Sequence, residues 1–345
     1  MSKARNIAAL STVEVAATTD QTKADLNAIG VSGGRKNLII NGGFDVWQRG
    51  TSFTANAYSS DRWLLYSTGS TRAVSQQTFT VGQTDVPNNP KHYLRDVVTS
   101  VAGASNMVNT RYRIEDVASL SGNTVTASFW AKADAGKNIA VEFQQYFGTG
   151  GSPSANVEVA PATVTLTTSW AKYTVSAAIP SITGKTIGSN NNDFLQLLFY
   201  MDAGSDKNAR TNSLGQQSGT FDFANVQLEL GSVATDFEHR SYGEELALCQ
   251  RYYQFIPQYA EWISGTTYST NRVLSAIAYQ GNMRVLPTAS VPAVTFYNNS
   301  AAPTSSSVGV VVKEKYIRLD ITVTAPTGRA GAVRVNDIIT LNAEL

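Results

Sequence analysis

The chain has 345 residues, a length that suggests two domains with extensions. Only 15% of the residues are charged, against about 25% in an average soluble protein, and the formal net charge is +1. A near-neutral chain lacks the basic surface that nucleic-acid binding requires, and no apolar run approaches the roughly 18 residues of a membrane-spanning helix. The single cysteine, Cys249, excludes an internal disulfide framework.

Residues 1–36 are small, polar and weakly patterned, and they predict an extended N-terminal arm. Asp20 and Gly30 are suitable first and last residues for a short helix within it. We expect the arm to dock on a larger assembly or on sister chains, with a disordered tail as the alternative. The apolar stretch of a cleavable export signal is missing, because Ser11 and Thr12 interrupt it.

Residues 37–240 are rich in alternating apolar positions separated by turn residues such as Gly122-Asn123. Many short strands without helices between them predict an antiparallel β-sandwich. Trp47, in a tight segment that ends at Gly50, is predicted to fill the core. The predicted strands begin near Leu38 and at Asp61, then cover 111–114, 125–131, 139–147, 157–166, 170–179, 194–201 and 221–230.

The last of these strands changes phase and leads into a helix. Phe221 and Phe223 alternate out of step with the apolar positions of 226–230, and a bulge at Ala224-Asn225 would return both sets to one face. Residues 241–244, Ser-Tyr-Gly-Glu, have the spacing of a capping box. Leu246, Cys249 and Tyr253 then follow on one helical face, so a linking helix is predicted over 241–256.

Strand patterns restart after the helix and predict a second, small β domain over 257–345. Its clearest signal is the alternation of Ile317, Leu319, Ile321 and Val323 with polar residues. Further strands are predicted at 272–279, 283–285, 308–312 and 332–335, and an exposed loop at 303–307.

No set of residues points to catalysis. His92 and His239 lie in polar contexts far apart and lack the spacing of a zinc site, so neither a metal nor a cofactor is predicted. Glu142 and Glu158 would have to share a cleft to act as a glycosidase pair, which sequence alone does not establish. Cys249 lies on the apolar helix face and is expected to be a small buried hydrophobe.

One sheet face is a candidate carbohydrate-binding surface. If the more apolar side of each strand faces the core, an outer face retains aromatic rings with amides between them. Rings stack on the C–H surface of sugars, and amides bond to hydroxyl groups. Subunit packing and ordinary sheet surface are the alternatives for the same residues. These candidates are Trp130, Gln144, Tyr146, Gln196 and Tyr200.

Three segments resemble modules of bacteriophage tail fibres and related virion proteins. They are NLIINGGFDVWQRG (37–50), FWAKADAG (129–136) and NVQLELGSVATDFEHRSYGEELALCQRYY (225–253). The resemblance implies a jelly-roll sandwich like that of carbohydrate-binding modules, then a short helix and a second β domain. It also implies a homotrimer and, in many such jelly rolls, a structural calcium ion. Here Ala224-Asn225 stands where a pair of acids would hold that ion, so no calcium is predicted.

The resemblance therefore leads us to expect a non-enzymatic virion protein, assembled in the cytoplasm of the bacterial host. As a tail-fibre or receptor-binding component it would recognise a host surface glycan, with the N-terminal arm contacting other virion proteins. A head-decoration, collar or neck-fibre protein with a mainly structural role is the alternative. A polysaccharide-degrading spike is a third hypothesis, and it requires paired carboxylates in a cleft.

Overall fold

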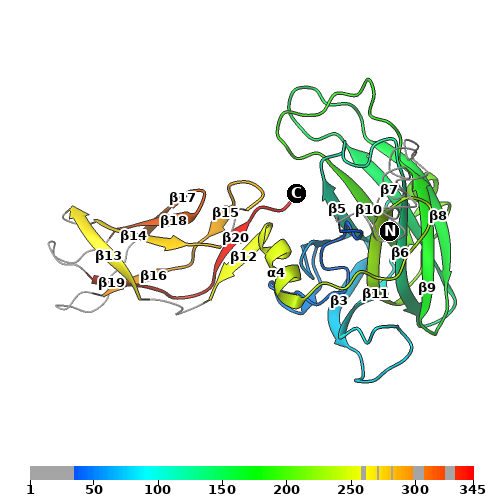
Figure 1. The fold of residues 1–345 in the computed structure, drawn as a ribbon, viewed down its shortest axis with the longest axis horizontal. Coiled ribbons are helices and arrows are strands. Elements are labelled where there is room, and N and C mark those ends of the chain that lie inside the picture. The colour runs from blue at the N-terminus through cyan, green and yellow to red at the C-terminus, as the bar shows by residue number, and fades with distance from the viewer. Residues whose placement is uncertain (1–34, 258–261, 270–271, 281–282, 298–306, 323–330) are drawn as a thin grey trace, which may run out of the picture.

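The computed structural model describes residues 35–257, 262–269, 272–280, 283–297, 307–322 and 331–345. A β-sandwich is followed by the helix α4 (Tyr242–Gln250) and then by smaller β-sheets on the far side of that helix (Figure 1). Within these ranges, no helix is both long enough and apolar enough to span a membrane. The fold is mostly β, as predicted. The arm lies almost wholly outside the described residues.

Two antiparallel sheets form the sandwich. The six-stranded sheet has the order β1 (Ser52–Phe53), β3 (Thr71–Thr78), β4 (His92–Thr99), β11 (Gly219–Leu230), β6 (Thr124–Ala133) and β9 (Ala171–Ala178). The five-stranded sheet has the order β2 (Trp63–Thr68), β5 (Met107–Glu115), β10 (Phe194–Ala203), β7 (Lys137–Tyr146) and β8 (Val157–Leu166). Alternate side chains from both sheets meet in one buried core, as the alternation predicted for β6, β7 and β10.

Trp63 is the large aromatic residue at the centre of this core. It is 1% exposed, and its ring packs against Phe44, Tyr112 and Phe199. Trp47 is only half-buried and stacks on Phe53 at the margin of the core, so the prediction that it fills the core was only partly right.

Strands β3 and β4 were not predicted, because charged residues occupy two of their core-facing positions. Arg72 on β3 and Asp96 on β4 have no exposed side-chain surface and form an ion pair inside the sandwich. The Arg72 guanidinium also donates to the backbone oxygen of Asn109 (2.6 Å) and to the hydroxyl of Thr110. The pair is therefore fully hydrogen-bonded, as a buried charge must be.

The predicted bulge in β11 is confirmed. The pairing of β11 with β6 shifts by one residue between Ala224 and Gln227, and Asn225 has a positive φ of 47°. Phe221, Phe223 and the apolar positions after the bulge consequently all lie in the same core. At the bulge, β11 also bonds to the N-terminal segment, because the amide of Val226 donates a hydrogen bond to the backbone oxygen of Gly42 (2.9 Å).

The linking helix α4 spans Tyr242–Gln250, and the chain then continues as strand β12 (Tyr253–Ile256) rather than as helix to 256. Ser241 caps it as predicted, accepting a hydrogen bond from the amide of Glu244 (3.3 Å). The carboxylate of Glu244 does not close the capping box but pairs with Arg35. Cys249 is buried, as expected.

Two further sheets make up the C-terminal part. One has the order β12, β20 (Ile339–Asn342) and β15 (Thr288–Ser290). The other has the order β16 (Val294–Tyr297), β19 (Gly331–Val335), β13 (Trp262–Ser269), β14 (Arg272–Ala278), β18 (Tyr316–Thr322) and β17 (Ser307–Val312). They share a core that includes Ile317, Leu319 and Ile321, which confirms the alternation there. The segment 283–285 is not a strand, and Val323 and residues 303–306 lie outside the described ranges.

Residues 344–345 return to the sandwich after β20. The Glu344 carboxylate pairs with Arg62, which is 1% exposed, and accepts a hydrogen bond from Arg49 (3.1 Å). The hydroxyl of Tyr58 donates to the backbone oxygen of Leu345 (2.7 Å). The C-terminal part is thus attached to the sandwich through α4 at its start and through these contacts at its end.

Candidate functional site

Four of the five candidate residues lie on the outer face of the five-stranded sheet. Gln144 and Tyr146 project from β7, and Gln196 and Tyr200 from β10, because the alternate side chains of both strands fill the core. Trp130 projects from β6 in the other sheet, so the prediction that all five share one face was wrong for Trp130.

Trp130 has a packing role on the six-stranded sheet. It is half-buried beside a small cluster formed by Phe79, Val86 and Ala224. Trp170 joins the same cluster, with its ring centroid 5.2 Å from that of Phe79. Such satellite clusters are usual beneath long connections, here the one between β3 and β4.

Two short helices cover one half of the candidate face, and sequence reasoning missed them. These are the 3-10 turn η1 (Ser205–Lys207) and α3 (Asn208–Thr211), followed by Leu214. Leu214 packs with Leu198 and Tyr200, and Tyr200 has no exposed surface. Tyr200 is therefore not available to a ligand on this face.

Arg210 of α3 attaches the short helix to the covered half of the face by binding the buried carboxylate of Glu142. Its Nε and Nη2 donate to the two oxygens of Glu142 at 2.9 and 2.6 Å, and the Tyr200 hydroxyl donates to the same carboxylate at 3.3 Å. Burial raises the pKa of Glu142, and the hydrogen bonds from Arg210 act in the opposite direction. Burial also raises the pKa of the Tyr200 phenol. This cluster fixes α3 on the sheet.

The uncovered half carries a row of three polar side chains in register, which we name the glutamine row: Gln196 on β10, Gln144 on β7 and Glu158 on β8. The Gln196 amide donates to Gln144 Oε1 (2.6 Å), and the Gln144 amide donates to Glu158 Oε1 (3.0 Å). Gln196 and Gln144 are 3% and 6% exposed, whereas Glu158 is exposed. The row thus runs from a buried end to a solvent-exposed end.

The carbonyl oxygen of Gln196 is buried and has no hydrogen-bond partner among the described residues. An unpaired buried acceptor costs about 1–3 kcal/mol, because it has lost its hydration and gained nothing in return. An incoming hydroxyl or amide group would remove that cost. The buried end of the glutamine row therefore has an acceptor whose hydrogen-bonding capacity is unused.

Aromatic and cationic groups border the glutamine row. The rings of Tyr146 and Phe194 stack with centroids 4.6 Å apart, in the row next to Gln196 and Gln144. The guanidinium of Arg113 lies 4.4 Å from the Phe194 centroid. Sequence analysis did not select Phe194 or Arg113. The alternation of Arg111 and Arg113 with buried Tyr112 was the signal that places Arg113 on this outer face.

The two acids of the glycosidase hypothesis do lie on neighbouring strands of this face. Both oxygens of Glu142 accept hydrogen bonds from Arg210, however, at 2.9 and 2.6 Å. Glu158 is engaged with the Gln144 amide. Within the described residues, no group of three or more His, Cys, Asp and Glu side chains is placed to hold a metal ion.

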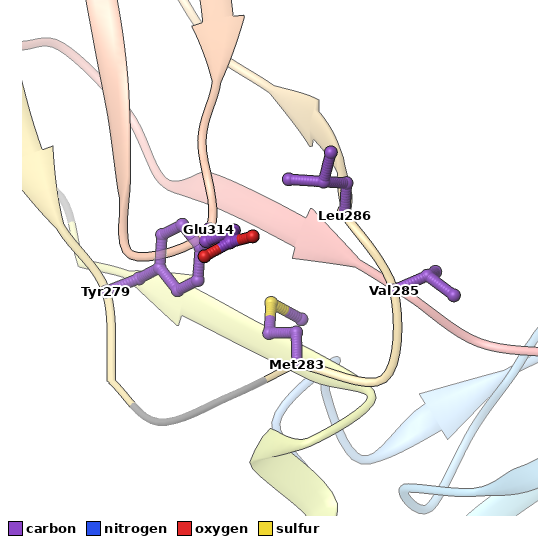
Figure 2. A pocket seen from close by; sticks show the side chains of 5 residues that line it. All are labelled: Tyr279, Met283, Val285, Leu286 and Glu314. Atoms are coloured by element: carbon purple, nitrogen blue, oxygen red, sulfur yellow. The ribbon is translucent and has the colours of Figure 1, made fainter.

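A separate hollow of about 330 Å³ lies in the C-terminal part. Figure 2 shows the side chains that line it, which are Tyr279, Met283, Val285, Leu286 and Glu314. Leu286, at the same hollow, is 60% exposed. The Tyr279 hydroxyl donates to the backbone oxygen of Lys313, so the ring adds mainly apolar surface.

Neither a protein-family model nor a curated protein matches the sequence. Among solved structures, the sandwich is similar to the enzymatically active domain of bacteriophage CBA120 tailspike protein 4 (15% identity, TM-score 0.33), with 56% of this chain and 21% of that chain covered. It is similar to a CBM4 carbohydrate-binding module (17%, TM-score 0.31), with 55% and 98% covered. A third is the Clostridium thermocellum family 11 carbohydrate-binding module in complex with a β-1,3-1,4-mixed-linked tetrasaccharide (12%, TM-score 0.31), with 54% and 98% covered. The chain thus spans about a fifth of the tailspike chain's length.

Proposed function

We propose that the protein binds a bacterial surface polysaccharide through the uncovered half of the five-stranded sheet, as a non-enzymatic tail-fibre or receptor-binding component of a bacteriophage virion. The observation that carries the proposal is the buried, unpaired carbonyl oxygen of Gln196 at the end of the glutamine row. A sugar hydroxyl is a donor of the right kind for it. Tyr146, half-buried beside the row, offers a ring on which a sugar ring can stack.

The non-enzymatic part is supported by the state of the carboxylates. A retaining or inverting glycosidase needs one acid that can be protonated and one free carboxylate. Arg210 binds both oxygens of Glu142, so neither oxygen is free to contact the glycosidic oxygen of a bound sugar. The glutamine row would then bind a sugar without supplying the proton that the leaving group of a glycosidase reaction needs.

The virion part of the proposal is supported by the resemblance of residues 37–50 and 225–253 to phage fibre modules. A homotrimer, as in those fibres, would combine several weak sugar contacts into strong attachment through avidity. The arm over 1–36 would contact other virion proteins. A head-decoration, collar or neck-fibre role is the second candidate, favoured by the fact that Gln144 and Gln196 already bond to each other and so satisfy part of this face internally.

Replacing Tyr146 with alanine is expected to weaken binding to extracted host polysaccharide by about tenfold or more, because a stacking surface is lost. Isothermal titration or affinity electrophoresis measures the change. Tyr242→Ala is the matched control, since Tyr242 is 60% exposed at the start of α4 and belongs to none of the strands that carry this face. Equal affinities of the two variants would reject this face as the binding surface. Absence of binding by the folded wild-type protein would favour the structural role.

A further inference from the structure

A hollow of about 500 Å³ lies where the sandwich meets the three-stranded sheet of the C-terminal part. Tyr58, which precedes β2, belongs to the sandwich side, and residues of β15 and β20 form the other side. Binding sites for small molecules commonly have volumes of roughly 300–1,000 Å³ and often lie between domains. The hollow therefore has the size and the location of a ligand site.

The strand register gives this hollow a polar wall. Thr288 lies opposite Asn342, and Ser290 lies opposite Thr340, so four polar side chains share one face of the β15–β20 pair. The alternate residues Ala289 and Leu341 turn to the other side and pack in the core.

Most of these groups are free to bond to a ligand. The hydroxyls of Thr288, Ser290 and Thr340 form no hydrogen bond with the described residues, and Thr288 and Ser290 are exposed. Asn342 accepts a hydrogen bond from the amide of Glu344 (3.0 Å) through its Oδ1, which leaves its NH₂ group as a donor. The wall thus offers three hydroxyls, each both donor and acceptor, and one amide donor.

The one charged side chain in the lining of this hollow already has cationic partners. Among the described residues that line it, only Glu344 has a charged side chain, and its carboxylate is engaged by Arg49 and Arg62. The backbone oxygen of Leu345 is likewise engaged, by Arg113 and Tyr58. A cationic ligand would have to compete with two guanidinium groups, and an anionic ligand would face the carboxylate without a free cation in the lining. Recognition here depends on hydrogen bonds rather than on charge.

We propose that this hollow is a second binding site, separate from the glutamine row, for an uncharged and hydroxyl-rich ligand such as a neutral monosaccharide or disaccharide unit. Its polar wall offers donors and acceptors for hydroxyl groups, and its volume accommodates one or two sugar rings. Because its residues come from both the sandwich and the C-terminal part, the bound sugar contacts the two at once.

The test uses the full chain and an array of neutral and acidic oligosaccharides, followed by titration with the best neutral ligand. Ser290→Trp places an indole in the hollow at an exposed position, and we expect binding of that ligand to weaken by about tenfold or more. Ser307→Trp, at an exposed serine of β17 that does not line the hollow, is the matched control and should bind as the wild type does. Thr288→Val, which removes one hydroxyl at nearly constant volume, should weaken binding several-fold.

Tyr146→Ala separates the two sites. If Tyr146→Ala still binds the neutral sugar and Ser290→Trp does not, the second site is supported, even if the glutamine row binds nothing. If Tyr146→Ala loses this binding and Ser290→Trp keeps it, the second site is overturned and the sugar is assigned to the glutamine row. Binding of acidic sugars alone, or no saturable binding of any neutral sugar by the folded wild type, also overturns it.

Discussion

Replacing Trp63 with alanine is expected to lower the free energy of unfolding of the sandwich by about 3–5 kcal/mol. Trp63 is 1% exposed and contacts the rings of Phe44, Tyr112 and Phe199. Its indole N–H also donates to the backbone oxygen of Asn41 (3.0 Å). The substitution removes this buried surface, leaves a cavity that the surrounding strands cannot fill, and leaves a buried carbonyl with one partner fewer.

Trp47→Ala is the matched control for this prediction. Trp47 is half-buried at the margin of the core, so its loss should cost less, about 1–2 kcal/mol. Denaturant unfolding followed by tryptophan fluorescence measures both variants, provided that their m-values agree. Equal losses would mean that Trp63 is not the centre of the core.

Arg72→Met is the second substitution with a large expected effect, again about 3–5 kcal/mol. Asp96 would then be left as a buried carboxylate without its cation, because both side chains have no exposed surface. The double variant Arg72→Met, Asp96→Leu removes both charges, and it should recover most of the loss. A double variant as unstable as Arg72→Met alone would show that hydrogen bonds of Arg72 to Asn109 and Thr110, rather than the charge pair, carry the effect.

The pH dependence of Arg72→Met gives an independent check. Burial raises the pKa of Asp96 in the wild type, and Arg72 acts to lower it. Without Arg72 this pKa rises further above the unfolded value of about 3.9, so the folded variant takes up a proton that the unfolded chain does not. Its stability deficit should therefore shrink as the pH falls from neutrality toward about 4. A deficit independent of pH over that range would contradict the assignment.

The sequence revealed strands best where most of the core-facing positions are apolar and none is charged. The alternations in β6, β7, β10 and β18 were read correctly, and the phase change between Phe223 and Val226 predicted a real bulge. Strands β3 and β4 escaped detection because Arg72 and Asp96 sit at core-facing positions. A buried ion pair looks like surface when only one strand is considered, since each charge finds its partner on the neighbouring strand.

The candidate site was predictable only in part, because several of its properties arise from tertiary structure. The outward side of β7 and β10 could be read from the sequence, so Gln144, Tyr146 and Gln196 were found. The short helix α3 has no strong pattern of its own, and so the burial of Tyr200 was missed. The assignment of β6 to the opposite sheet, which removes Trp130 from the site, depends on strand order alone.

The contacts of Glu344 and Leu345 with the sandwich have a mechanical consequence. The segment from β12 to β20 is held at its first strand by α4 and at its end by Arg62 and Tyr58. A domain attached at one point can rotate about that point as a hinge. A second attachment restricts this rotation, so that a force on the domain is transmitted to its neighbour. A lateral load on the C-terminal sheets should therefore reach the sandwich as a twist, and the sandwich and those sheets should turn together.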